Sequence, residues 1–548
     1  MYFRPALFTL FALLIFTFGF GCQKSTSIIP AAPPTVLAPD TIARVHWLGK
    51  RRLGYEATAF FLMRVWNLSQ TAQLERQTID RLTTAPLRLL PGGSNLAATS
   101  SVLLLPLIYD LEQEQTYFEI RATTNAQPFG ATKPNEGGST FNPEPTFVLA
   151  LRLNDPAQAG RWFTNLATVL GQFTGAYASV NTAGNGWSLK LTNAPALIQL
   201  TRVGDWTIVA AGPAQSPLLA EITIRIKRDH VPFVSAGTNL WLEANLDLPR
   251  LTTIFPAFSS QLLTLNRLSL TLTGDGANVI TRAQLTFAEP LPLQLEPWHI
   301  PLDLMHEPLI GFTAGRGLQP WLAVWKNWQN LPIGTPPDQL FLWSVAGSPY
   351  QTYLAAPLPD ARQQVSALTG WLLQTANPWL ATNGYIAFDR AENMNGVTWG
   401  NLPDIKPFIT SVETGSQSYL FAGLLPATGT DAAGPPPTGL IQDVLRRTNL
   451  VYYDWEITGS RLQPCLQLGQ TARQIARRTQ MSLDSTSLRW LATVIPRLGT
   501  SATIINHTGP NQLEFYRRAT LGLTAPELHL LTDWLESPQF PSGLHSTR

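Results

Sequence analysis

Residues 147–173 read FVLALRLNDPAQAGRWFTNLATVLGQF, and a related pattern, TYLAAPLPDARQQVSALTGWLL, returns at residues 352–373. In each copy an apolar segment typical of a strand ends at an Asp, and a helical pattern begins directly after it. Asp155 and Asp360 are therefore predicted to be N-caps, because an Asp side chain can accept an N–H from the first turn of a helix. Trp162 and Trp371 fall on the apolar helix faces and are predicted to point inward.

The correspondence continues beyond these two segments. Asn185-Gly186 corresponds to Asn395-Gly396, and an Asn-Gly pair strongly favours a hairpin. Since the order and spacing of such landmarks repeat, the sequence predicts two tandem lobes at residues 94–295 and 296–537. Hairpins form antiparallel pairs and amphipathic helices need an apolar surface to cover. The predicted fold class is therefore α+β, with each lobe an antiparallel sheet covered by helices on one face.

Each predicted lobe closes with a hairpin. In the first lobe two alternating runs flank Gly274-Asp275-Gly276, and in the second lobe two such runs flank Thr508-Gly509-Pro510. The second lobe also carries an insertion before its closing hairpin, and residues 486–495 within that insertion have a helical pattern.

The N-terminus has the features of a targeting segment. Residues 1–22 contain one positive charge, a run without charged residues from Ala6 to Phe20, and then Gly21-Cys22. The run is shorter than the roughly 20 residues of a membrane-spanning helix and is typical of a secretory signal. The ending at residues 18–22 resembles a bacterial lipoprotein signal, in which a small residue precedes the lipidated cysteine, and this resemblance implies that Cys22 is the lipidation site. Gly19 stands where lipoprotein signals usually have Leu, so cleavage near Ala31-Ala32 and retention as a signal anchor remain alternatives.

Three further segments are assigned from composition. Residues 23–40 contain Pro30, Pro33, Pro34 and Pro39 without an apolar period, which predicts a flexible tether. Residues 41–93 are predicted to be mainly helical, and residues 538–548 are predicted to be a disordered tail.

Composition limits the partners of the protein. Only 14% of the residues are charged and the net charge is +2, so we expect no nucleic-acid partner. After the leader no apolar run approaches membrane-spanning length, and the body is expected to be soluble. If Cys22 carries lipid, Cys465 has no intramolecular partner, and its apolar surroundings predict a buried, inert thiol.

The sequence contains few motifs with a known chemistry. No phosphate-binding glycine motif, nucleophile elbow or His-Glu-x-x-His is present, so no cofactor is expected. His299, Asp303, His306 and Glu307 place two imidazoles and two carboxylates within nine residues, and these are plausible metal ligands by type. The flanking prolines oppose a regular helix, so a polar linker is the alternative interpretation.

A second concentration of side chains suggests ligand binding. If Pro320 begins a helix, Trp321, Trp325 and Trp328 share one face and could line a groove for a glycan or an acyl chain. An aromatic stripe at helical spacing also occurs in helices that pack into a core. Arg316 lies between two glycines, in a loop that could bind an anion or simply turn.

The leader and the repeated lobes together suggest a class of protein. The chain resembles bacterial lipoprotein-like envelope proteins of unknown function, which implies an exported protein on the periplasmic or cell-surface side of a membrane. The resemblance assigns no functional residues. We interpret the protein as a membrane-tethered, non-catalytic binding or assembly protein whose partner is an apolar ligand or an envelope protein. The alternatives are a metal-assisted hydrolase using His299, Asp303 and His306, and a purely structural envelope role.

Overall fold

The computed structural model describes residues 38–89, 97–122, 145–174, 179–180, 184–190, 196–213, 217–235, 237, 239–254, 265–346, 351–382, 388–390, 395–399, 406–425, 434–475 and 485–541. These residues form two compact units. Unit 1 comprises residues 38–289 and 534–541, and unit 2 comprises residues 290–533. The lobes predicted from the sequence were residues 94–295 and 296–537, whereas unit 1 also includes residues 38–89 and 534–541. Cys22 and most of the predicted tether lie outside the described residues.

Unit 1 contains an antiparallel sheet in which the described strands follow the order β4-β5-β6-β7-β3-β2-β1-β8-β9-β10. The strands are β1 (Thr41–Trp47), β2 (Thr116–Arg121), β3 (Thr146–Arg152), β4 (Ser179–Val180), β5 (Gly186–Lys190), β6 (Ala196–Val203), β7 (Trp206–Pro213), β8 (Leu242–Asp247), β9 (Leu265–Gly274) and β10 (Val279–Phe287). Residues 41–93 were predicted to be mainly helical, but they begin with β1, which lies between β2 and β8.

Unit 2 contains an antiparallel sheet with the order β14-β15-β16-β17-β13-β12-β11-β18-β19-β20 in the described residues. The strands are β11 (Leu309–Arg316), β12 (Gln339–Val345), β13 (Thr352–Pro357), β14 (Phe388–Arg390), β15 (Gly396–Trp399), β16 (Phe408–Thr414), β17 (Gln417–Gly423), β18 (Leu450–Ile457), β19 (Thr500–Gly509) and β20 (Gln512–Ala519). Counted from the first strand of each unit, the two orders are the same.

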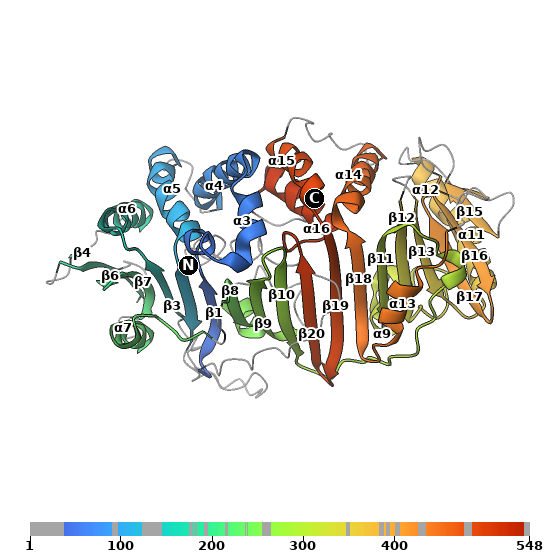
Figure 1. The fold of residues 1–548 in the computed structure, drawn as a ribbon, viewed down its shortest axis with the longest axis horizontal. Coiled ribbons are helices and arrows are strands. Elements are labelled where there is room, and N and C mark those ends of the chain that lie inside the picture. The colour runs from blue at the N-terminus through green and yellow to red at the C-terminus, as the bar shows by residue number, and fades with distance from the viewer. Residues whose placement is uncertain are drawn as a thin grey trace, which may run out of the picture. The chain divides into compact units, whose positions relative to one another are not determined.

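The described helices lie in the connections between these strands, except for α16, which follows the last strand (Figure 1). Those of unit 1 are α2 (Lys50–Leu53), η1 (Ala57–Ala59), α3 (Phe60–Trp66), α4 (Ser69–Leu89), α5 (Ala97–Gln113), α6 (Pro156–Thr174), α7 (Pro217–Asp229) and α8 (Leu248–Ile254). Those that begin in unit 2 are η4 (Leu302–Leu304), α9 (Gln319–Val324), α10 (Lys326–Gln329), α11 (Ala361–Trp371), η5 (Leu372–Ala376), α12 (Asn377–Thr382), α13 (Thr438–Leu445), α14 (Thr458–Ile475), α15 (Thr486–Val494), η6 (Ile495–Arg497) and α16 (Ala525–Glu536).

Helices cover both faces of the unit 1 sheet, not one face as predicted. On β3, Leu149 and Leu151 pack with Trp162 of α6, whereas Val148 and Ala150 pack with Ile222 of α7. Successive side chains of a strand point to opposite faces, so α6 and α7 lie on opposite sides of the sheet (Figure 1). A strand buried on both faces has a continuous apolar run, which explains the sequence of residues 147–151.

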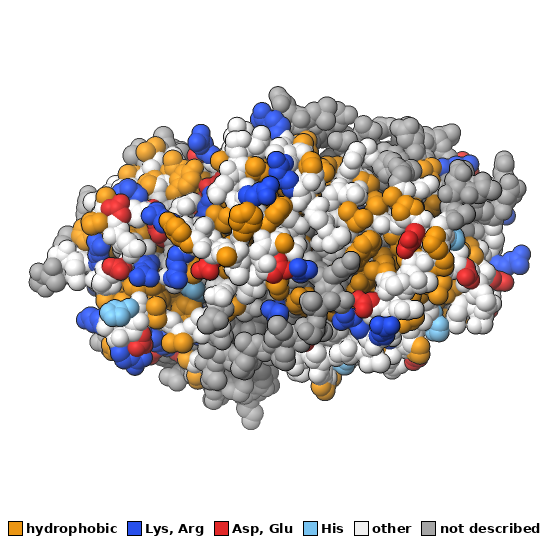
Figure 2. Space-filling model, viewed as in Figure 1, with side chains coloured by type: hydrophobic (Ala, Val, Ile, Leu, Met, Phe, Trp, Pro, Cys, Tyr) orange, Lys and Arg blue, Asp and Glu red, His pale blue; other side chains and the backbone are white. Residues whose placement is uncertain are grey.

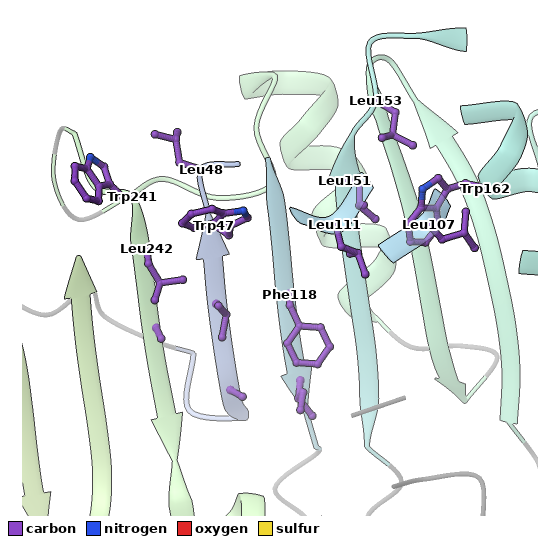
Figure 3. Packing of buried hydrophobic residues seen from close by; sticks show 14 of the residues in the cluster. Trp47, Leu48, Leu107, Leu111, Phe118, Leu151, Leu153, Trp162, Trp241 and Leu242 are labelled. Atoms are coloured by element: carbon purple, nitrogen blue, oxygen red, sulfur yellow. The ribbon is translucent and has the colours of Figure 1, made fainter. Parts of the chain in front are cut away.

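The larger core of unit 1 lies on the α6 side. Trp47 and Phe118 of the central strands, Leu107 and Leu111 of α5, and Trp162 of α6 belong to one buried cluster (Figure 3). Trp162 is only 3% exposed, as predicted from its position on the apolar face of α6.

Unit 2 is likewise covered on both faces. Tyr419 of β17 packs in one cluster with Ile441 of α13, and the next residue, Leu420, packs in another with Leu368 of α11. Trp371 of α11 is half-buried against this second cluster. The described helices α11 and α13 therefore lie on opposite faces of the sheet.

The two predicted N-caps differ. Asp155 Oδ1 accepts a hydrogen bond from the Ala157 amide at 2.8 Å, so this cap is present. Asp360 makes no side-chain cap and has a φ of 52°, in the left-handed region. The prediction for Asp360 was wrong because that backbone conformation places its main-chain carbonyl, not its side chain, against the amides of Gln363 and Gln364.

The described part of the predicted disordered tail, residues 538–541, is ordered. Phe540 is fully buried, with its ring centroid 4.9 Å from that of Trp534 and the Arg81 guanidinium 5.2 Å above it. An aromatic anchor of this kind gives the segment a defined position.

Candidate functional site

The residues predicted to hold a metal do not come together. In the described part of the chain, no group of three or more His, Cys, Asp or Glu side chains could hold a metal ion. A ring nitrogen of His306 lies 3.1 Å from the Gly434 carbonyl, and Asp303 is exposed on the 3-10 turn η4. Met305 is fully buried and anchors the segment in the core. The predicted site at His299, Asp303, His306 and Glu307 is therefore wrong as a four-ligand cluster.

The predicted tryptophan face is also absent. The helical backbone is interrupted at Trp325, whose ψ of 115° separates α9 from α10, so the three residues do not share one helix face. Trp321 and Trp325 are 42% and 52% exposed, whereas Trp328 packs against the cluster around Leu368. Helical periodicity predicted the stripe, but an extended residue in the middle removes the i,i+4 relation.

Arg316, predicted as a possible anion ligand, has a structural role. It is 3% exposed and donates hydrogen bonds to the backbone carbonyls of Leu450, Glu296 and Thr448. Burial lowers the pKa of its guanidinium, and the carboxylate of Asp338 acts in the opposite direction. Because its donors already bind carbonyl oxygens, Arg316 is not available to an external anion.

A pocket of about 510 Å³ lies in unit 2 between α13 and the sheet. It is lined by the residues that lead into β11, the beginning of α13 and one face of β18, namely Glu307, Pro308, Leu309, Pro437, Gly439, Leu440, Asp443, Tyr453 and Trp455. Its volume falls within the range of about 300–1,000 Å³ that is usual for small-molecule sites. On the molecular face shown in Figure 2, hydrophobic side chains lie beside acidic ones in the region of α13.

The floor of the pocket is set by the alternation of β18. Tyr453 and Trp455 point to the same face and pair in register with Ala314 and Phe312 of β11. Between them, Asp454 points to the opposite face. The sequence run therefore presents two aromatic side chains to the pocket and keeps the intervening carboxylate out of it.

A close backbone contact fixes the rim. The Glu307 amide donates to the Pro435 carbonyl at 3.0 Å, and a Cβ at Gly434 would lie 2.1 Å from the Glu307 carbonyl oxygen. Only glycine fits at position 434, and the contact holds Glu307 beside the segment that enters α13.

The rim of the pocket is acidic. Glu307 is exposed and, among the described residues, has no cation within ion-pair distance, whereas Asp443 lies 3.9 Å from Arg447 one turn along. Among the described residues, no Lys or Arg belongs to the lining. The arrangement combines an apolar, aromatic floor with two carboxylates.

The corresponding face of unit 1 is filled. Phe233 stacks on Tyr117, with ring centroids 4.9 Å apart, and lies 4.5 Å from the His46 ring. Phe233 belongs to the connection from α7 to β8, residues 230–241, whereas the connection from α13 to β18 is only residues 446–449. The longer connection supplies a side chain that covers the sheet.

Charged groups are buried beneath Phe233 in unit 1. Arg44 pairs with Glu243 at 3.1 Å, and Arg121 pairs with Glu119 at 2.7 Å. Tyr117 donates a hydrogen bond to the other oxygen of Glu119. Buried charges persist when they are paired in this way, and we assign this network to the structure of unit 1.

His46 is the titratable member of this region with the largest downward shift. Burial, together with the positive charges of Arg52 and Arg44, lowers the pKa of His46 from 6.5 to about 4. One ring nitrogen lies 3.0 Å from the Gln115 amide nitrogen, which requires that this ring nitrogen act as the acceptor. His46 is therefore neutral in the folded protein at neutral pH.

Acidification is expected to destabilise unit 1 through His46. Because its folded pKa is lower than its unfolded pKa, the unfolded chain binds the proton first, and the free energy of unfolding decreases as pH falls from about 6.5 to 4. The expected loss approaches about 3 kcal/mol, at about 1.4 kcal/mol per pKa unit, and is absent above pH 6.5. Urea unfolding of the wild type and of His46→Gln between pH 4 and 8 checks this.

The free energy of unfolding of His46→Gln should depend less on pH than that of the wild type. Glu112, whose pKa burial raises to about 7, acts with the opposite sign in both proteins. The difference between the two proteins in the slope of unfolding free energy against pH therefore gives the contribution of His46. Equal slopes would contradict the expectation.

A second buried network lies in unit 2, on the side of β18 opposite the pocket. Arg461 of α14 is 3.1 Å from both Asp454 and Glu456. Glu456 also accepts a hydrogen bond from the Ala525 amide at the beginning of α16, at 2.7 Å. Cys465 is half-buried on the same helix, and burial raises the pKa of its thiol to about 11, so it carries little thiolate at neutral pH.

Of the described lining residues, only Glu307 was predicted from the sequence as a functional residue, and for a different chemistry. The lining residues before β11 are more than one hundred residues away from those on α13 and β18. The alternating aromatic residues Tyr453 and Trp455 were the available signal, but alternation alone does not tell an open face from a covered one.

Among the described residues, no helix is both long and apolar enough to cross a bilayer.

Comparisons with known proteins give little similarity. No protein-family description matches the chain, and no curated protein sequence matches it. A solved structure titled "Structure of crystal form III of TP0453" aligns with 55% of this chain and 88% of its own, at 9% identity and a TM-score of 0.23. A TM-score this low carries no argument about fold or function.

Proposed function

We propose that this chain is an exported, membrane-tethered binding protein of the bacterial envelope, and that unit 2 holds a small ligand in the pocket between α13 and β18. The observation that carries the proposal is the pocket itself, whose floor contains Leu309, Leu440, Tyr453 and Trp455. An apolar floor with a few polar groups at the rim is typical of small-molecule sites. Its ligand has an apolar part that rests on this floor.

The tether is the second part of the proposal. It rests on the leader sequence, with its apolar run from Ala6 to Phe20 followed by Gly21-Cys22. A diacylated Cys22 would hold the protein on a membrane surface. Metabolic labelling with a radioactive fatty acid tests this, and equal labelling of the wild type and of Cys22→Ala would contradict it.

We further infer that the two units descend from a duplication of one strand and helix arrangement. The inference is supported by the identical strand order and by the matching places of α6 and α11, each of which follows the third strand of its unit. On this view the pocket marks functional divergence, since the longer connection in unit 1 covers the equivalent face with Phe233.

Filling the pocket is expected to weaken ligand binding. Gly439 belongs to the pocket lining and a Cβ there meets nothing within 4 Å, so we expect the helix to tolerate Gly439→Trp and the indole to reduce the space for a ligand. With the neutral fluorescent probe N-phenyl-1-naphthylamine, the expected loss is at least about tenfold in affinity, which corresponds to about 1.4 kcal/mol. Fluorescence titration of the purified full chain measures it.

The matched control is Gly370→Trp. Gly370 lies on α11, its Cβ position is equally open, and it is not part of the pocket lining. This variant should bind the probe like the wild type. Equal probe binding by Gly439→Trp and the wild type would overturn the proposal.

A further inference from the structure

We infer that the pocket of unit 2 selects small organic ammonium ions that carry an apolar or aromatic group, an inference that rests on the proposed binding function. In the described part of the chain, the lining contains two carboxylates, Glu307 and Asp443, and no Lys or Arg. A ligand with a positive charge at one end and an apolar body matches the acidic rim and the apolar floor together.

The two carboxylates of the lining differ from the buried carboxylates of the protein in their ion pairs. Glu456 is bonded to Arg461 and Glu243 to Arg44, both at 3.1 Å. In contrast, Glu307 has no ion pair among the described residues, and Asp443 has its Arg447 partner at the outer limit of 3.9 Å. A carboxylate without a close cationic partner, beside an apolar surface, favours binding of a ligand whose ammonium group reaches the carboxylate while its apolar body contacts the surface.

The aromatic floor adds to this preference. Tyr453 and Trp455 present their side chains from the same face of β18. Aromatic faces attract ammonium groups within about 6 Å, with Trp the strongest of the three aromatic residues. The half-buried Trp455 also supplies apolar area for the ligand body.

One feature of the pocket acts in the opposite sense. The first turn of α13 lies at the pocket and carries a partial positive charge of about half a unit, which favours anions. Two full negative charges line the same space, and they outweigh this partial charge. The net preference is therefore for a cation.

Calorimetric titration of the detergent-purified full chain with three ligands of similar size tests the inference. The ligands are phenethylamine, phenethyl alcohol and phenylacetate, which carry a positive, a neutral and a negative group on the same aromatic body. We expect the amine to bind at least about tenfold more tightly than the alcohol, the difference of one charge-assisted hydrogen bond. Phenylacetate should bind more weakly than the alcohol.

Neutral, isosteric variants identify the groups responsible. Glu307→Gln, at an exposed position, should weaken amine binding about tenfold and leave the alcohol within about twofold of the wild type. Asp443→Asn should act in the same direction. Asp303→Asn removes another exposed carboxylate of the same segment that is not in the lining, and it should change neither ligand.

The outcomes separate this inference from the function on which it rests. Equal affinities for the amine and the alcohol, or unchanged amine binding by both Glu307→Gln and Asp443→Asn, overturn the cation preference and leave a pocket for apolar ligands. Tighter binding of phenylacetate overturns it in favour of an anion at the beginning of α13. If none of the three ligands binds, and Gly439→Trp does not alter binding of the fluorescent probe, both proposals fail.

Discussion

Replacement of Arg461 by Met should lower the free energy of unfolding of unit 2 by about 3–5 kcal/mol, the usual consequence of removing one partner from a buried ion pair. Arg461 is the shared partner of Asp454 and Glu456, which are 4% and 0% exposed. Burial, and then the nearby charge of Asp454, raise the pKa of Glu456, and Arg461 acts against this rise. Without Arg461, Asp454 and Glu456 would remain buried and would lose the cation that compensates their negative charges. Urea unfolding followed by circular dichroism measures the change.

The pH dependence of this loss has a defined sign. A buried carboxyl whose folded pKa lies above its unfolded value destabilises the protein when it is charged, and the destabilisation disappears as pH falls and the group binds a proton. The loss caused by Arg461→Met should therefore be larger at pH 8 than at pH 5. Adding Asp454→Asn and Glu456→Gln to the variant should recover part of the stability, because neutral groups no longer require the cation.

Arg362→Met is the control for this experiment. Arg362 is exposed, so its replacement should change the free energy of unfolding by no more than about 0.5 kcal/mol. A loss for Arg461→Met as small as that of the control would show that the network does not stabilise the contact between α14 and β18.

Trp162→Ala is expected to destabilise unit 1 by about 3–5 kcal/mol, the range for truncation of a buried aromatic residue. Trp162 is 3% exposed and packs near Leu107 and Leu111 (Figure 3), in a buried cluster that also includes Leu166. The substitution leaves a cavity between α6 and α5. It also removes the indole N–H that donates to Asp110 at 3.0 Å. Thermal or urea unfolding measures the loss.

Two further variants separate these contributions. Trp162→Phe keeps most of the ring volume but loses the hydrogen bond to Asp110, and it should destabilise by about 1–3 kcal/mol. Trp325→Ala, at a 52% exposed position, makes the same chemical change without leaving a buried cavity. A similar loss of stability for Trp162→Ala and Trp325→Ala would contradict the assignment of Trp162 to the core.

Local periodicity was sufficient to predict many of the elements. The apolar face of α6, the closing hairpins β9–β10 and β19–β20, and the helix α15 all have short-range signals, since their turns and caps lie within a few residues. Ser485, for example, caps α15 by accepting a hydrogen bond from the Leu488 amide.

Long-range pairing decided what the periodicity could not. β1 pairs with β8, which places Val45 opposite Ala244, and nothing in the local sequence links these segments. The prediction that residues 41–93 are mainly helical therefore missed β1, whereas α2, η1, α3 and α4 make most of the described segment helical. The covering of both sheet faces was missed because a run such as residues 147–151 has the same pattern whether one or two layers of helices pack against it.

The candidate site depended even more on tertiary structure. Glu307 and Asp443 are distant in sequence and line one pocket only because β11 and β18 are neighbours and α13 crosses their face. His299, Asp303 and His306 are close in sequence, yet among the described residues no group of three or more His, Cys, Asp or Glu could hold a metal ion. Residue types determine which chemistry is available, but side-chain direction determines which groups meet. That direction depends on strand register and on which neighbours are buried.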